Sequence, residues 1–145
     1  MKIKTQDLTG HALRLAVLIA DGGSYWTRAN AAWPRDHGAQ TGWILEKDGS
    51  LKKHEYSESS RTGHFFHCDT YEPDADWSQG GPIIERERID LAHSHPESHN
   101  ATRGIHCTAR INGLYLGGPT PLIAAMRCYV SSRLGEEVEV PNELA

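Results

Sequence analysis

Residues 117–130 contain the feature that most restricts how this chain can fold, a glycine turn followed by a well-marked helix start. Thr120 is suited to cap a helix through its side-chain oxygen, and Pro121 suits the first helical position because it has no N–H to leave unpaired there. Apolar residues then follow at helical spacing, at Leu122, Met126, Tyr129 and Val130. We therefore predict a helix over residues 120–134 that buries this apolar face and ends at Gly135.

Residues 76–87 form a second distinctive segment, in which a tryptophan, a serine and a glutamine precede Gly80-Gly81-Pro82 and a run of charged residues. We interpret the glycines and the proline as a turn that opens a strand over residues 83–91. Adjacent glycines also let backbone N–H groups approach a ligand, and successive N–H groups in such a turn can hold an anion. The turn is therefore either a plain strand start or part of an anion-binding loop.

The rest of the chain predicts one more helix and several short strands. Apolar residues recur at intervals of three and four over residues 6–21, which predicts an amphipathic helix that stops at Gly22 or Gly23. Strands are expected at residues 41–47, 51–54, 64–68 and 111–116, with a polar loop at 57–63 and an alternative turn at Asn112-Gly113. Together these elements predict an α+β fold, a small antiparallel sheet packed with an N-terminal and a C-terminal helix, in a single globular domain over residues 1–145.

Charge and composition exclude some classes of function. The 15 basic and 19 acidic residues give a formal charge of −4, whereas a duplex nucleic-acid binder normally needs a basic face. The longest apolar run, residues 15–20, is too short to cross a membrane, so we expect no membrane partner. Three widely spaced cysteines are best interpreted as reduced thiols. Self-association is left open.

Four segments of the chain resemble the NinX-type family of small proteins from lambdoid phages and prophages. They are the two segments described above together with residues 2–10 and 134–141, somewhat less than half of the chain. The histidine-rich segment at residues 93–107 takes no part in the resemblance. The resemblance implies a phage accessory protein in the cytoplasm of the infected bacterial host. No settled biochemical activity comes with it, so function has to be argued from the residues.

The histidine-rich segment supports a zinc-dependent hydrolase as one alternative function. His93-Ser94-His95-Pro96 is similar to part of the JAMM metallopeptidase motif, but the Ser and Asp that complete this motif do not follow. Imidazole and thiolate are natural zinc ligands, and the weak candidates here are His95, His99, His106 and Cys107. Because their spacing fits no standard zinc site and no known nucleophile motif is present, we expect no metal, no other cofactor and no catalytic residue.

Binding without turnover is the function that the residues favour. The ring of Trp77 can stack on a nucleobase, the start of the helix at Thr120 can supply backbone donors, and arginines can hold phosphate. We predict a pocket between the Gly80-Gly81 turn and the start of that helix, lined by Trp77, Ser78, Gln79, Gly80, Gly81, Arg86, Arg88, Thr120 and Arg127. The expected ligand is a small phosphorylated or nucleotide-like molecule, and such a pocket can sequester a host defence signal. A protein–protein inhibitor of a host enzyme remains the other alternative.

Overall fold

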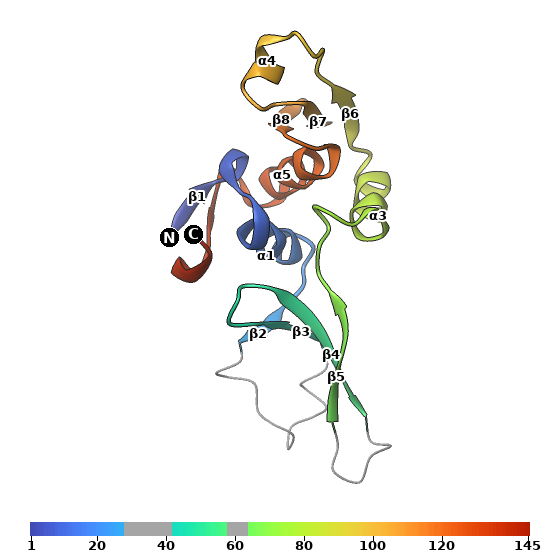
Figure 1. Cartoon of the computed structure of the whole chain (residues 1–145), viewed down its shortest axis with the longest axis vertical. Helices are drawn as coiled ribbons and strands as arrows, with labels where there is room; N and C mark the ends of the chain where they lie inside the picture. The colour runs from blue at the N-terminus through green and yellow to red at the C-terminus, as the bar shows by residue number, and fades with distance from the viewer. Residues whose placement is uncertain (28–41, 58–63) are drawn as a thin grey trace. The chain divides into compact units, whose positions relative to one another are not determined.

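The computed structural model of the chain describes residues 1–27, 42–57 and 64–145. Its contacts divide the chain into two compact units, drawn in Figure 1. We call Met1–Asp21 with Glu72–Ala145 the helical unit, and Gly22–Tyr71 the strand unit. The predicted α+β class is confirmed, because helices and short sheets both occur. A single domain over residues 1–145 stays a prediction.

The central element of the helical unit is the predicted C-terminal helix, which the structure places at Pro121–Leu134 and which we label α5. The side chain of Thr120 accepts a hydrogen bond from the Ile123 N–H at 3.2 Å, so it caps the helix as its sequence position predicts. Gly135 ends the helix with a φ of 95°, a value that a side chain would disfavour. The prediction for this helix is confirmed.

One face of α5 packs on a three-stranded antiparallel sheet of β6 (Asp90–His93), β7 (Cys107–Ile111) and β8 (Leu114–Gly118), in the order β6-β7-β8 (Figure 1). Alternate residues of β7, namely Cys107, Ala109 and Ile111, are buried. The strand predicted over residues 111–116 is wrong as one strand, because Asn112 and Gly113 have φ values of 47° and 85° and connect β7 to β8. The alternative turn at these two residues is correct, since two successive positive φ values are typical of a tight hairpin.

The N-terminal helix predicted over residues 6–21 is confirmed as α1, Gly10–Ala20. The residues before it form a short strand, β1 (Lys2–Lys4), and a 3-10 turn, η1 (Thr5–Asp7). Strand β1 pairs with β9 (Glu137–Glu139), which brings the two ends of the chain together (Figure 1). Two further short elements complete this unit, α4 (His99–Thr102) and η2 (Asn142–Leu144).

The Gly-Gly-Pro turn and the strand over residues 83–91 are wrong, because Trp77–Glu87 forms a helix, α3. Asp76 caps it: its carboxylate accepts from the Ser78 N–H at 2.9 Å and from the Ser78 hydroxyl at 2.6 Å. The helix ends at Arg88, whose φ of 53° is left-handed. Only the last part of the predicted strand exists, as β6.

The strand unit contains β2 (Tyr25–Thr27), β3 (Gly42–Leu45), β4 (Leu51–Ser57) and β5 (His64–Thr70), in that order. The first two strands are parallel and the other pairs are antiparallel. The strands predicted at residues 41–47 and 51–54 are confirmed over the described residues as the antiparallel pair β3 and β4, with Gly49 at a φ of 90° in the turn between them. The strand predicted at residues 64–68 is confirmed as β5, whereas Thr41 and most of the loop predicted at 57–63 lie outside the described residues.

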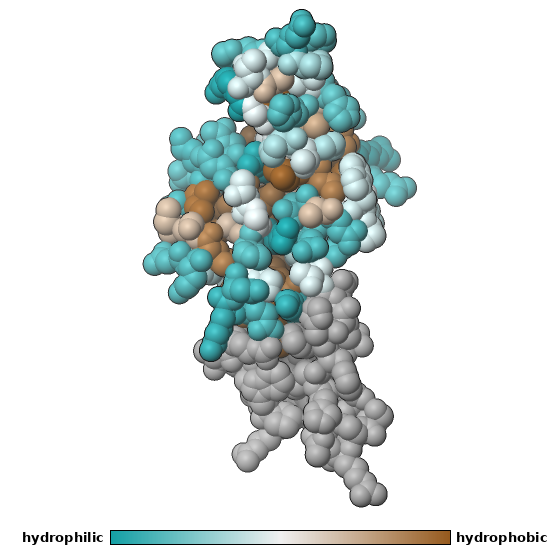
Figure 2. Space-filling view, in the orientation of Figure 1, coloured by the Kyte–Doolittle hydropathy of each residue, from teal (hydrophilic) through white to brown (hydrophobic). Residues whose placement is uncertain are grey.

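Within the described residues, no helix is long and apolar enough to cross a membrane. On the face shown in Figure 2, hydrophilic residues surround the hydrophobic ones of the helical unit. Cys107 and Cys128 are buried free thiols, and Cys128, which is a residue of α5, has no exposed surface.

Candidate functional site

The two glycines predicted to form an anion-binding turn lie inside α3, where their N–H groups are not available in that way. The Gly80 N–H donates to the Asp76 carbonyl oxygen at 2.9 Å, and the Gln79 N–H donates to the same oxygen at 3.0 Å. A Cβ on Gly80 would lie 2.3 Å from the Pro73 carbonyl oxygen and 2.6 Å from Cδ2 of Leu122. Gly80 is therefore needed for the close packing of α3, and the premise of a free glycine loop is wrong.

The structure does bring Trp77 and Thr120 together. They line a hollow of about 420 Å³, which we call the Trp77 hollow, with Arg14, Asp74, Ala75, Pro121, Leu122 and Ile123. The side chain of Trp77 is 56% exposed. Arg14 is already paired, because its Nε donates to Oδ1 of the buried Asp74 at 2.7 Å. This hollow offers an aromatic ring and apolar side chains, and its arginine is committed to a carboxylate.

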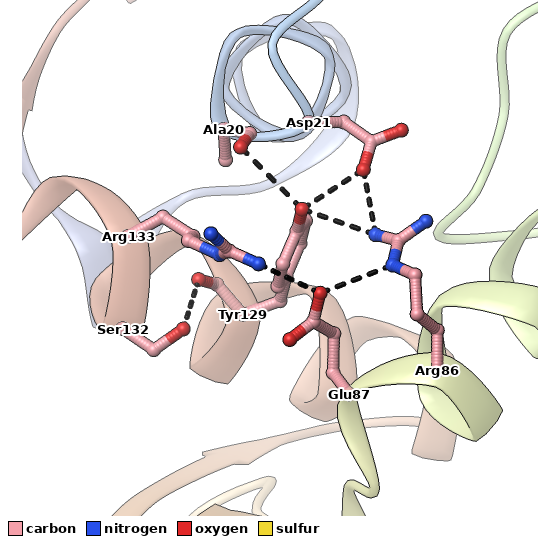
Figure 3. A network of polar contacts seen from close by, with 7 residues as sticks. All are labelled: Ala20, Asp21, Arg86, Glu87, Tyr129, Ser132 and Arg133. Atoms are coloured by element: carbon pink, nitrogen blue, oxygen red, sulfur yellow. Dashed lines mark hydrogen bonds and ion pairs between the residues drawn. The ribbon is translucent and has the colours of Figure 1, made fainter.

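Arg86 belongs to a separate network that ties α1, α3 and α5 together (Figure 3). Its Nη2 donates to Oδ1 of Asp21 at 2.6 Å and to the Tyr129 hydroxyl at 3.2 Å. Glu87 accepts from Arg86 at 3.0 Å and from Arg133 at 2.9 Å. Burial, together with the hydrogen bond to Asp21, raises the pKa of Tyr129. These hydrogen bonds and ion pairs link the three helices, and we call this network the helix clamp.

Three other predicted residues, on α3 or at its end, do not line the Trp77 hollow. Ser78 donates to the Asp76 carboxylate, and Gln79 accepts at 2.8 Å from the Glu72 N–H. Both side chains thus support the start of α3. Arg88 is exposed at the end of the same helix.

Arg127 projects from α5 into a different hollow. This second hollow has a volume of about 510 Å³, and we call it the Arg127 hollow; it is lined by Gln6, Asp7, Arg103, Gly104, Ile105, Tyr115, Leu116, Gly117, Gly118, Pro119 and Arg127. Only 9% of Arg127 is exposed. Its Nε donates to the Leu8 carbonyl oxygen at 2.8 Å, and its Nη1 donates to the Gly117 carbonyl oxygen at 3.0 Å. The guanidinium group is thereby held rigidly at the wall of the hollow.

The third nitrogen of this guanidinium group is open. Nη2 of Arg127 forms no hydrogen bond with the described residues. Among those residues the one buried side-chain polar atom without a partner is Nδ1 of His11, so solvent reaches Nη2. Burial lowers the pKa of Arg127, and the charge of Asp7 opposes this effect from a distance. In the described part of the chain no carboxylate oxygen lies within 4.0 Å of Arg127, so its charge is not neutralised by direct contact.

Arg103 and Tyr115 also line this hollow, and neither was among the residues predicted from the sequence. Arg103 is exposed at the end of α4 and forms no ion pair within the described residues. Tyr115 is 60% exposed on β8, and the Arg110 guanidinium carbon lies 6.0 Å from its ring centre. The sequence signal for Tyr115 was an aromatic residue in the strand predicted over residues 111–116, whereas its exposure and the edge position of β8 are known only from the structure. Arg103 had none, because its position depends on how the segment between β6 and β7 folds back.

The candidate zinc ligands do not gather into a site. In the described part of the chain, no three His, Cys, Asp or Glu side chains lie close enough to hold a metal ion. Nδ1 of His93, in the same segment, lies 3.4 Å from Sγ of Cys107 across β6 and β7. Cys107 is 2% exposed and its burial raises the pKa of the thiol, so it is not activated as a nucleophile.

Comparison with known proteins assigns the family. The model of the family described as Bacteriophage P22, NinX matches residues 4–133, well over half of the 145 residues. The chain belongs to this family. No curated protein matches the sequence.

The NinX match is longer than the resemblance found in the sequence. It runs through residues 93–107, the segment in which no resemblance was seen, and it contains the Trp77 hollow and the Arg127 hollow. Membership identifies a bacteriophage protein family and leaves the ligand to be argued from the geometry.

Proposed function

We propose that the chain binds a small phosphorylated or nucleotide-like molecule without converting it, with the anionic group in the Arg127 hollow. The observation that carries this proposal is the state of Arg127: it is 9% exposed and has no carboxylate within 4.0 Å among the described residues. A buried cation without a contacting anion is unfavourable, and an anionic ligand at Nη2 relieves that cost. The guanidinium of Arg103, which forms no ion pair within the described residues, adds a second positive charge to the same hollow.

Three features favour phosphate and nucleotides over other anions. A guanidinium group matches the oxygens of phosphate in geometry and charge. The exposed ring of Tyr115 offers a surface on which a base can stack. A volume of about 510 Å³ falls within the size range of small-molecule sites.

The two arginines of the Arg127 hollow are suited to holding a ligand rather than to breaking a bond in it. Arginine keeps its proton at physiological pH and cannot exchange it as a general acid or base. Binding without turnover lowers the free concentration of a ligand in the cell. For a member of a phage family, we propose that this role is played in the cytoplasm of the infected host and that the ligand is a host defence signal.

Isothermal titration calorimetry of the whole chain tests this function. The panel is AMP, ATP, ADP-ribose and inorganic phosphate, each with the wild type, Arg103→Ala and the control Arg133→Ala, which removes an equal charge from α5. We expect at least one phosphorylated compound to bind, and Arg103→Ala to weaken its binding by about 1 kcal/mol, or roughly fivefold. Binding that is equally affected by Arg133→Ala, or no binding by any compound at millimolar concentration, contradicts the proposal.

A specific observation favours a second candidate, inhibition of a host protein. Trp77 is 56% exposed beside apolar side chains in the Trp77 hollow, and exposed tryptophans are common centres of protein interfaces. This candidate predicts that one host protein co-purifies with the wild type and is lost with Trp77→Ala. Retention of that protein by Trp77→Ala contradicts it.

A further inference from the structure

The Arg127 hollow lies along a free strand edge. β8 is the last strand of its sheet and pairs only with β7 among the described residues. In an antiparallel pair, the backbone groups of successive residues point alternately toward the partner strand and away from it. Gly118 points toward β7, because its carbonyl oxygen accepts from the His106 N–H at 3.1 Å. Gly117 and Tyr115 therefore point their backbone groups outward.

The contact with Arg127 supports this direction independently. The Gly117 carbonyl oxygen accepts from Nη1 of Arg127 at 3.0 Å, on the side of β8 away from β7. The N–H of a strand residue lies on the same side as its carbonyl, so the Gly117 N–H faces the hollow as well. By the same alternation, neither this N–H nor that of Tyr115 takes part in the pairing with β7. Two outward-facing backbone donors thus belong to residues that line the same hollow as Arg127.

The charges around these donors limit how much negative charge a ligand can carry. Arg103 and Arg127 face the single carboxylate of Asp7 in the hollow, which leaves one net positive charge. A further hollow of about 340 Å³ shares Tyr115 with the Arg127 hollow and is lined by Lys4, Glu136 and Glu137, which give it one net negative charge. A triphosphate extending that way would meet these two glutamates, whereas a single phosphoryl group would not.

We infer that the ligand of the Arg127 hollow is a mononucleotide with one phosphoryl group. Its phosphate accepts from Nη2 of Arg127 and from the Gly117 N–H, and its base lies on the ring of Tyr115. Asp7 and Gln6, which line the same hollow, accept from the hydroxyl or amino groups of the ligand. This inference rests on the proposed function and adds to it the number of phosphates and the residue that holds the base.

Calorimetry with AMP, ATP, adenosine and inorganic phosphate tests the inference on the whole chain. We expect AMP to bind about tenfold more tightly than adenosine and than phosphate, because only AMP makes both the charged and the stacking contacts. ATP should bind less tightly than AMP. Tyr115→Ala should weaken AMP binding by about tenfold, the effect of losing one base–aromatic stack, and leave phosphate binding unchanged.

Trp77→Ala is the matched control, because it removes an exposed aromatic ring from the other hollow and should leave AMP binding unchanged. ATP binding as tightly as AMP, or Tyr115→Ala binding AMP like the wild type, overturns the inference. If ADP-ribose binds in an Arg103-dependent way while AMP does not bind, the inference fails and the proposed function stands. If no phosphorylated compound binds, both fail.

Discussion

Arg127 and Gly117 are joined by a 3.0 Å hydrogen bond from the guanidinium Nη1 to the carbonyl oxygen, which fixes a helix residue to an edge strand. Two of the three guanidinium nitrogens are engaged by backbone carbonyls, and the third is open to a hollow. Arg127 therefore has a structural role and a proposed binding role at once. Variants must separate the two.

Arg127→Met should destabilise the protein even without ligand. The change leaves the Leu8 and Gly117 carbonyl oxygens without their charged donor, and we expect a loss of about 2–4 kcal/mol in the free energy of unfolding. Urea denaturation followed by circular dichroism measures it. Arg133→Met, on the exposed side of α5, is the control and should change stability by less than about 1 kcal/mol. Equal stabilities for the two variants would show that the Arg127 hydrogen bonds do not contribute to the free energy of unfolding.

Replacing each of the two glycines of α3 by alanine should change the stability of the protein in opposite directions. Gly80→Ala places a Cβ 2.3 Å from the Pro73 carbonyl oxygen, and the forced movement should cost about 1–3 kcal/mol. Gly81→Ala meets nothing within 4 Å and should stabilise the helix by roughly 0.5–1 kcal/mol. Thermal unfolding of the two variants checks this. A turn at these residues, as the sequence alone predicts, would not produce this difference.

The cap at the start of α3 should weaken in acid. Hydrogen bonds from the side chain and the N–H of Ser78 hold the pKa of Asp76 below its ordinary value of 3.8. A carboxylate with a lowered pKa in the folded state stabilises the protein above its unfolded pKa and loses that effect as the pH falls through the folded pKa. The stability difference between the wild type and Asp76→Ala should thus be constant above about pH 5 and shrink below about pH 4.

Asp76→Asn is the control for this titration, because its amide oxygen can accept from the Ser78 N–H at any pH. The stability difference between Asp76→Asn and Asp76→Ala should not change with pH over the same range. Urea denaturation between pH 3 and pH 7 measures both differences. If the stability difference between the wild type and Asp76→Ala stays constant down to pH 3, the Asp76 carboxylate does not act as the cap.

Arg86→Ala should lower stability and leave ligand affinity unchanged. Arg86 is half exposed and contacts Asp21, Glu87 and Tyr129, so we expect a loss of about 1 kcal/mol from the helix clamp. The residue does not line the Arg127 hollow, so AMP affinity measured by calorimetry should match that of the wild type. A clear drop in AMP affinity would return Arg86 to the ligand site where the sequence analysis placed it.

The sequence was sufficient to predict elements whose signals are local. It was insufficient where contacts with distant segments determine the structure. The cap at Thr120, the proline after it and the apolar spacing all lie within α5, so this helix was predicted correctly. In α3, the glycines and the proline indicate a turn by themselves. Gly80 is instead kept small by its contact with Pro73 and Leu122, a reason that exists only after folding.

The composition of the candidate site depends on long-range pairing in the same way. Arg127 was identified as a ligand-binding residue from its chemistry, but its neighbours in the hollow come from η1, β8 and the segment after α4. Only the β7–β8 hairpin and the packing of α5 bring Tyr115 and Arg127 to one hollow. The spacing of apolar residues within one segment does not show which distant segments pack against each other.

The most direct test of the account is to locate the ligand by NMR. Amide chemical shifts of the labelled whole chain are recorded while AMP is added, with the Arg127 Nε signal followed in the same spectra. We predict that the largest changes occur at the Gly117 and Tyr115 N–H groups and at Arg127 Nε. Changes concentrated instead at Trp77 and Leu122, with Gly117 and Tyr115 unmoved, would contradict it.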